Sequence, residues 1–157
     1  MKKLIKLISF CTISVLLTSC GSANPIVSTR NLLLKKKWQP DFVQLYDQNG
    51  NVIKEQAIKY DKKCSGVIIN FLDSGVATYS NSSLLNNQCN TNTFNGTWSL
   101  NNYILSQTYP NHSDKDLSAY ITSITNVYMI LEVNVLDSER GSLPAGAKKY
   151  RYYYKSK

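Results

Sequence analysis

The sequence has few of the residues on which catalytic and metal sites usually depend. Its 157 residues include one histidine, His112, and ten carboxylates that are scattered without a pair at suggestive spacing. A familiar nucleophile–base arrangement would have to use His112, which lies in the polar segment 111–116 with no nucleophile elbow nearby. A catalytic or metal-binding role for His112 together with Asp114 and Asp116 is the less favoured alternative. We therefore expect no enzyme, no catalytic residue and no cofactor.

Long hydrophobic runs are also missing. The N-terminal apolar stretch, 7–17, is far shorter than the ~20 residues that a membrane-spanning helix needs. It follows a lysine-rich start and leads into the sequence Leu-Thr-Ser-Cys, which ends at Cys20. This order is similar to the signal peptide and lipobox of bacterial lipoproteins. The resemblance implies that residues 1–19 are a signal peptide, that Cys20 is acylated, and that the protein is attached to a membrane through this residue.

The residues after Cys20 bear on where such a lipoprotein resides. Gly21 is not the aspartate that commonly retains bacterial lipoproteins in the inner membrane, and no acidic run of the kind that directs them outward follows it. The resemblance therefore implies a cell-envelope protein anchored in the outer membrane and facing the periplasm. We expect residues 20–31 to be a tether and residues 32–157 to form one domain, because the remaining chain can enclose one core but not two.

Cysteine is scarce in the part of the chain expected to fold. Only Cys64 and Cys89 remain there, and with one histidine they are too few for a tetrahedral zinc site, so we expect no metal. An even number of cysteines in an exported protein favours a disulfide between them. Such a bridge closes a loop of about 25 residues and contributes about 3 kcal/mol in the loop-entropy model.

What the sequence does contain, from Trp38 onward, is a series of short runs rich in Val, Ile, Thr, Tyr and Phe. Turn signals separate these runs, and no long segment keeps the 3.6-residue apolar period of an amphipathic helix. The paired runs predict hairpins between 42–46 and 52–58, 67–72 and 76–80, 96–100 and 103–107, and 119–124 and 127–136, with a last strand over 148–155. About nine strands at hairpin spacing predict an all-β antiparallel sandwich or barrel.

Alternation along two of these strands indicates which face is interior. The odd positions from 127 to 135 form an apolar row, whereas Glu132 lies on the opposite face. In the last strand Tyr150, Tyr152 and Tyr154 share one face, and basic side chains occupy the other. A register slip of one residue would bury those charges, so we expect the three tyrosines to face the interior.

An ordered set of features resembles the bacterial lipocalin-like lipoproteins. Residues 34–38 read Leu-Lys-Lys-Lys-Trp where the family has Leu-x-Gly-x-Trp, with Lys36 in place of the glycine. Cys64 and Cys89 follow, and a Gly-Thr-Trp hairpin starts at Gly96. The resemblance covers about residues 32–155 and implies a small lipocalin-like antiparallel barrel of about eight or nine strands that binds a small apolar or amphipathic ligand. The candidate cavity residues are Trp38, Phe71, Trp98, Tyr103, Tyr150, Tyr152 and Tyr154.

Two hypotheses about function remain open at this stage. A barrel of about eight strands either leaves room for one small ligand or fills with side chains, and a filled barrel would favour a non-enzymatic protein-binding module such as an inhibitor or an adhesion module. The basic residues at 35–37 and on the outer face of the last strand predict a solvated, aggregation-resistant surface. We expect no nucleic-acid partner, because lipid anchoring places the protein outside the cytoplasm.

Overall fold

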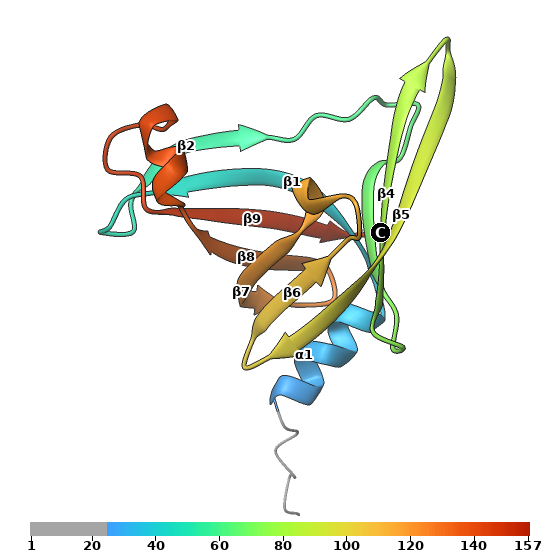
Figure 1. The fold of residues 1–157 in the computed structure, drawn as a ribbon, viewed down its shortest axis with the longest axis horizontal. Helices are drawn as coiled ribbons and strands as arrows, with labels where there is room; N and C mark the ends of the chain where they lie inside the picture. The colour runs from blue at the N-terminus through green and yellow to red at the C-terminus, as the bar shows by residue number, and fades with distance from the viewer. Residues whose placement is uncertain (1–24) are drawn as a thin grey trace, which may run out of the picture.

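Nine strands and one α-helix form residues 25–157, the part of the chain that this computed structural model describes (Figure 1). The elements are α1 Pro25–Leu34, β1 Lys37–Tyr46, β2 Val52–Ala57, β3 Gly66–Phe71, β4 Val76–Leu85, β5 Gln88–Asn101, β6 Ile104–Thr108, β7 Leu117–Ile124, β8 Tyr128–Asn134 and β9 Lys149–Ser156, with short 3-10 helices η1 Ser113–Lys115 and η2 Asp137–Ser142. Residues 1–24, which include the predicted signal peptide and Cys20, lie outside this part. Within residues 25–157, no helix has the length and apolar character needed to cross a membrane.

The strands form one antiparallel sheet that closes on itself. Their order is β2-β1-β3-β4-β5-β6-β7-β8-β9, and β1 also pairs with β9 along its length. Eight strands therefore make a closed barrel, and β2 is an extra strand beside β1. This arrangement confirms the predicted all-β antiparallel barrel.

The turns follow the local sequence. Asp47 Oδ1 accepts hydrogen bonds from the backbone N–H groups of Asn49 and Asn51, which shapes the β1–β2 turn. Hydrogen bonds from Asn51 lower the pKa of Asp47. Asn86 and Asn87 have φ angles of 50° and 63°, so they form the tight turn at the tip of the long β4–β5 hairpin. The outer part of this hairpin was not predicted, because most of residues 81–95 are polar and show no alternation of apolar and polar positions.

The barrel is splayed where β1 leaves β3. Only Lys37 and Trp38 of β1 pair with β3, and from Phe42 onward the same edge of β1 pairs with β2. The chain 58–65, called the strap from here on, then runs from β2 across the gap to β3. Figure 1 shows β2 and the strap passing over the barrel toward the β4–β5 hairpin. One end of the barrel is open in consequence.

Helix α1 covers the opposite end (Figure 1). The helix buries Thr29 and Leu33. The Arg30 guanidinium lies 4.7 Å from the centre of the Trp98 ring and forms an ion pair with Asp73. Residues 20–31 were expected to be a tether, but residues 25–34 are helical and bury Thr29 and Leu33. The helix was missed because it buries only two side chains, too few to produce a visible apolar period.

Side chains fill the barrel next to α1. The core residues there share near-complete burial, and they are Leu33, Trp38, Phe71, Trp98, Leu105, Met129 and Leu131. The two indole N–H groups donate to backbone carbonyls, Trp38 to Leu33 at 3.2 Å and Trp98 to Leu72 at 2.8 Å. Because buried polar groups are satisfied in this way, the two large side chains are fixed in the core.

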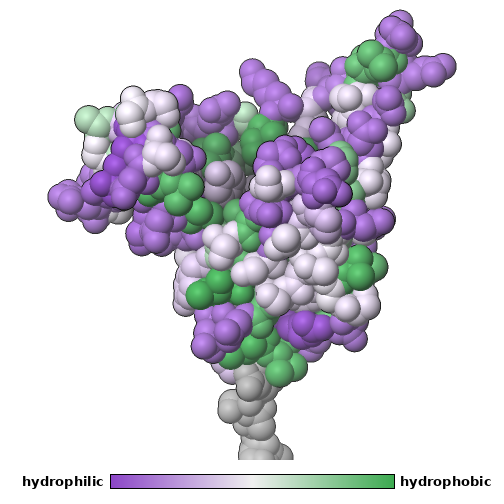
Figure 2. Space-filling view, viewed as in Figure 1, coloured by the Kyte–Doolittle hydropathy of each residue, from purple (hydrophilic) through white to green (hydrophobic). Residues whose placement is uncertain are grey.

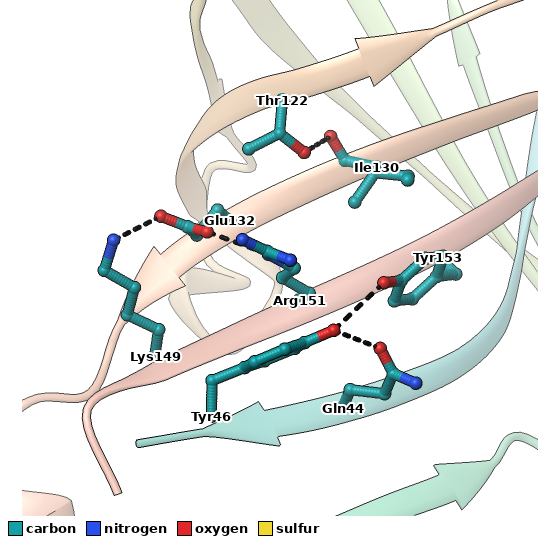
Figure 3. A network of polar contacts seen from close by, with 8 residues as sticks. All are labelled: Gln44, Tyr46, Thr122, Ile130, Glu132, Lys149, Arg151 and Tyr153. Carbon is teal, nitrogen blue, oxygen red and sulfur yellow. Dashed lines mark hydrogen bonds and ion pairs between the residues drawn. The ribbon is translucent and has the colours of Figure 1, made fainter. Parts of the chain in front are cut away.

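A polar network on the outer face holds the register of the closing strands (Figure 3). Glu132 of β8 accepts hydrogen bonds from Lys149 at 2.6 Å and Arg151 at 2.9 Å, both on β9. Tyr46 of β1 lies beneath the Arg151 guanidinium, 4.4 Å from it, and its hydroxyl is 3.3 Å from that of Tyr153. Burial, with the contact to Tyr46, raises the pKa of Tyr153 to about 12. With these groups outside, Tyr150, Tyr152 and Tyr154 face inward as predicted.

Candidate functional site

A pocket of about 410 Å³ lies at the open end of the barrel, and we call it the tyrosine pocket. Figure 2 shows the surface hollowed on this side, between the β1–β2 region and the projecting β4–β5 hairpin. Strands β1, β3, β4, β7 and β9, the strap and η1 contribute its lining, which is Pro40, Ile58, Tyr60, Val67, Ile69, Tyr79, Asp114, Lys115, Asp116, Leu117, Tyr152 and Tyr154. Apolar and aromatic side chains predominate, with a polar group at one rim, as in small-molecule sites of this size.

Two tyrosines of β9 form one wall of the pocket. Tyr152 and Tyr154 are two residues apart, so both point to the inner face of a strand that is paired on both edges. Tyr154 is 6% exposed. Burial raises the pKa of both phenols, and each is therefore neutral at physiological pH and able to donate a hydrogen bond.

The strap forms the roof of the pocket and is held at several points. Ile58 N–H donates to the Asp41 carbonyl at 2.8 Å, and Tyr60 hydroxyl donates to the Pro40 carbonyl at 2.9 Å. At its far end the disulfide predicted from the sequence joins Cys64 to Cys89 of β5. The strap is therefore tied both to β1 and to the β4–β5 hairpin.

Gly66 makes the packing of the strap possible. Its φ angle is +67°, and a Cβ atom there would lie 2.2 Å from Cδ1 of the Tyr60 ring. Only glycine has both the left-handed backbone and the space for that ring. Burial raises the pKa of Tyr60, in keeping with a ring that packs against β3 at Gly66.

The rim opposite the strap is polar. Lys115 of η1 pairs with its neighbour Asp114 and lies 5.8 Å from the centre of the Tyr79 ring. Asp116 Oδ1 accepts the backbone N–H of Tyr109 at 2.6 Å. Among the described residues that line the pocket, Lys115 is the one cation and is paired with Asp114, so the two carboxylates leave this rim negative overall.

Several polar groups of the interior have unused hydrogen-bonding capacity. The hydroxyls of Tyr79, Tyr152 and Tyr154 make no hydrogen bond with another group in residues 25–157, although all three side chains line the pocket. Deeper in the barrel, Gln107 is 3% exposed and its Oε1 accepts from the Tyr109 hydroxyl, whereas its Nε2 has no partner among the described residues. The pocket thus combines apolar walls with a few available donors.

The seven cavity residues proposed from the sequence occupy three different settings. Tyr152 and Tyr154 line the tyrosine pocket, and Tyr150 lines a neighbouring one. Tyr103 lies in the β5–β6 turn with a φ angle of 67° and contacts Tyr120 instead of the pocket. The remaining three, Trp38, Phe71 and Trp98, belong to the filled core beside α1.

Much of the pocket lining was not predicted from the sequence. Tyr79 lies in the predicted strand 76–80, and its alternation with buried Ala77 was a usable signal. Tyr60, Asp114 and Lys115 come from irregular segments, whose side-chain directions follow no period. His112 packs against Phe94, with 4.0 Å between ring centres, and lies outside the pocket lining. Within residues 25–157 no three His, Cys, Asp or Glu side chains converge to hold a metal ion.

Comparison with known proteins gives only distant similarities. No protein-family model matches the sequence, and no curated protein is significantly similar to it. A lipocalin-like protein from Bacteroides uniformis is 16% identical, covers 78% of this chain and 96% of its own, and has a TM-score of 0.48. An uncharacterized protein from Bacteroides eggerthii is 15% identical, with 78% and 98% covered and a TM-score of 0.47. Japanin from Rhipicephalus appendiculatus, bound to cholesterol, is 7% identical, with 80% and 76% covered and a TM-score of 0.44.

Proposed function

We propose that this protein binds one small apolar or amphipathic molecule in the tyrosine pocket. The observation that carries the proposal is a pocket of about 410 Å³ at the open end of the barrel, above a packed core that extends from α1 to Ile69 and Tyr154 of the pocket lining. A filled base and an open upper half are what a barrel of this size needs to enclose one small ligand. The neutral phenols of Tyr152 and Tyr154 offer hydrogen bonds to a ligand with a polar atom.

The proposal includes attachment to the cell envelope through acylated Cys20, as the N-terminal sequence suggests. Only residues 21–24 separate Cys20 from Pro25 at the start of α1. At about 3.5 Å per extended residue, this link would keep the start of α1 within roughly 18 Å of an anchored cysteine. In this arrangement α1 lies near the outer membrane, and the tyrosine pocket, at the other end of the barrel, opens toward the periplasm.

Replacement of the predicted lipid-bearing cysteine tests the anchoring. We expect Cys20→Ser to leave the membrane fraction, because it removes the thiol that would carry the acyl chains. Cys11→Ser, which changes a cysteine within the predicted signal peptide, is the matched control and is expected to remain membrane-bound. Membrane attachment of Cys20→Ser equal to that of the control would refute the anchoring.

Truncation of a pocket tyrosine tests ligand binding. Tyr152→Ala enlarges the tyrosine pocket, so we expect a several-fold change in the affinity of an apolar fluorescent probe with a tolerable loss of stability. Tyr120→Ala, on the outer face where the side chain is 48% exposed, is the control and is expected to leave probe affinity unchanged. If Tyr152 were part of a filled core, its truncation would lower the free energy of unfolding by about 3 to 5 kcal/mol. Such a loss, with no probe uptake by either protein, would refute ligand binding.

One observation supports a second function, contact with another protein. The β4–β5 hairpin projects from the barrel (Figure 1), and Leu85, next to its turn, is 57% exposed. A projecting hairpin with an exposed apolar residue at its tip suits a protein-binding module. Protein binding becomes the favoured function if neither the wild type nor Tyr152→Ala binds an apolar probe.

A further inference from the structure

The β5 edge of the projecting β4–β5 hairpin has no neighbouring strand over most of its length. Strand β6 pairs with β5 only from Thr97 to Asn101. Residues 88–96 of β5 pair with β4 on one edge and with no strand on the other edge among residues 25–157. Figure 1 shows this part of the hairpin extending beyond the barrel. Binding in the tyrosine pocket makes no use of this edge.

Alternate residues of β5 point their backbone groups at the unpaired edge. In an antiparallel sheet, the N–H and C=O groups of successive residues point to opposite edges of the strand. The Trp98 N–H donates to the Gly75 carbonyl beside β4, so the even-numbered residues face β4. The residues that face away from β4 and have no paired strand among residues 25–157 are Cys89, Thr91, Thr93 and Asn95. We call residues 89–95 the free edge.

The accessible part of the free edge is centred on Thr91. Residues 88–93 are all exposed. Further along the strand, the His112 ring packs against Phe94, with 4.0 Å between ring centres. At Gly96 a Cβ atom would lie 2.2 Å from the Thr108 carbonyl oxygen, so the chain after β6 closely approaches the strand there. A partner strand can therefore reach the backbone groups from residue 89 to residue 93, and Thr91 is the midpoint of this segment.

The free edge is held in position before any partner binds. The disulfide joins Cys89 to Cys64 of the strap. Thr91 Oγ1 lies 2.7 Å from Ser82 Oγ, so a hydroxyl pair also joins the two strands of the hairpin at this level. Because the edge is already ordered, a partner strand can pair with it at little cost in conformational entropy to the hairpin.

The free edge lacks the charges that usually protect an exposed strand from pairing. Lysines, prolines and bulges are the common forms of protection. Strand β2, an edge strand of the described sheet, contains Lys54 and Glu55. By contrast, no Asp, Glu, Lys or Arg occurs in the sequence between Asp73 and Asp114. The whole chain has a net charge of +8, so the hairpin is an uncharged surface on a basic protein, where a second copy meets the least charge repulsion.

We propose that two copies of this protein pair their free edges antiparallel about a two-fold axis at Thr91. The axis places Thr91 opposite its own copy, and it places residue 89 of each copy opposite residue 93 of the other. Each such pair exchanges two N–H···O=C hydrogen bonds, about six in all. Both copies use the same edge, so the association stops at a dimer. This short segment buries far less than a standard interface of about 1,600 Å², so the dimer is weak and concentration-dependent.

Opposite charges introduced at position 91 test this pairing. Thr91→Lys and Thr91→Asp each place two like charges opposite each other at the axis, so each variant alone should dimerise about tenfold more weakly than the wild type. An equal mixture of the two variants should recover the association, because unlike charges then meet. Sedimentation velocity of the full-length protein in detergent, over a range of concentrations, measures the dimer fraction. Ser83→Lys, which adds a charge to an exposed position of β4, is the control and should dimerise like the wild type.

A second variant tests the backbone pairing without a change of charge. Thr91→Pro removes the N–H that points away from β4 and leaves the backbone hydrogen bonds between β4 and β5 intact, so it should also weaken the dimer. Recovery in the mixture of charged variants separates contact at position 91 from a folding defect, since a misfolded hairpin would not recover.

Three results would overturn the dimer. These are a wild type that stays monomeric at every concentration, a mixture that associates no better than the single variants, and a Ser83→Lys variant as weak as Thr91→Lys. An unchanged dimer in Thr91→Pro would overturn the pairing through the free edge. All of these variants should take up an apolar probe as the wild type does, so failure of the dimer leaves the function proposed for the tyrosine pocket untouched.

Discussion

Gly66→Ala should destabilise the protein more than the same substitution at Gly50 or Gly146. All three glycines have a positive φ angle, but only at Gly66 would the new Cβ atom meet a neighbouring side chain. A non-glycine residue in the left-handed region costs roughly 1 to 2 kcal/mol. At Gly66 the new Cβ would also lie 2.2 to 2.8 Å from three atoms of the Tyr60 ring, which must move. Displacement of that ring breaks the hydrogen bond from Tyr60 to Pro40, a loss of about 1 kcal/mol, and leaves packing defects in the strap. The expected total is about 3 to 4 kcal/mol.

Gly50 supplies the matched control for this substitution. Its φ angle is +82°, similar to that of Gly66, but a Cβ atom there meets nothing within 4 Å. Gly50→Ala should therefore lower the free energy of unfolding only by the backbone strain, roughly 1 to 2 kcal/mol. Urea unfolding of both variants measures the difference, and probe binding should weaken only in Gly66→Ala because Tyr60 lines the tyrosine pocket. Equal destabilisation of the two variants would refute the account of the strap.

Two further predictions concern stability. Reduction of the Cys64–Cys89 disulfide should lower the free energy of unfolding by about 3 kcal/mol, and an unchanged urea midpoint with reductant would contradict this. Burial alone would raise the pKa of Glu132, but hydrogen bonds from Lys149 and Arg151 outweigh it, so the folded-state pKa lies below the ordinary value of 4.5. The stabilisation from Glu132 is therefore present above pH 4.5 and is lost as the pH falls through the lower folded-state pKa. Wild type and Glu132→Gln should differ most at pH 7 and converge near pH 2, and a constant difference would contradict the assignment.

Much of the fold could be predicted because the turns and the alternation of side chains are local properties. Asn49-Gly50 and the inward row Tyr150, Tyr152 and Tyr154 indicate strand ends and faces without knowledge of the rest of the chain. The outer part of the β4–β5 hairpin was not predicted because both of its faces are exposed to solvent. Helix α1 was missed for a related reason, since Thr29 and Leu33 alone bury against the barrel.

The candidate site was harder to predict than the fold. Alternation places Tyr152 and Tyr154 inside, but it does not show which part of the interior is filled. That depends on α1, which closes one end over Trp38 and Trp98 and leaves the other end open. Tyr60 reaches the pocket through a strap whose path depends on the disulfide and on Gly66, both of which act between segments distant in sequence.

The central claim is that the tyrosine pocket holds a small molecule, and native mass spectrometry of the full-length protein purified from cell envelopes tests it most directly. The wild type should carry a small-molecule adduct that is lost on denaturation. Val67→Trp, which places a large side chain in the pocket, should lack that adduct and should no longer take up an apolar probe. An adduct-free wild type that takes up no probe, or an adduct retained equally by a folded Val67→Trp, would contradict the claim.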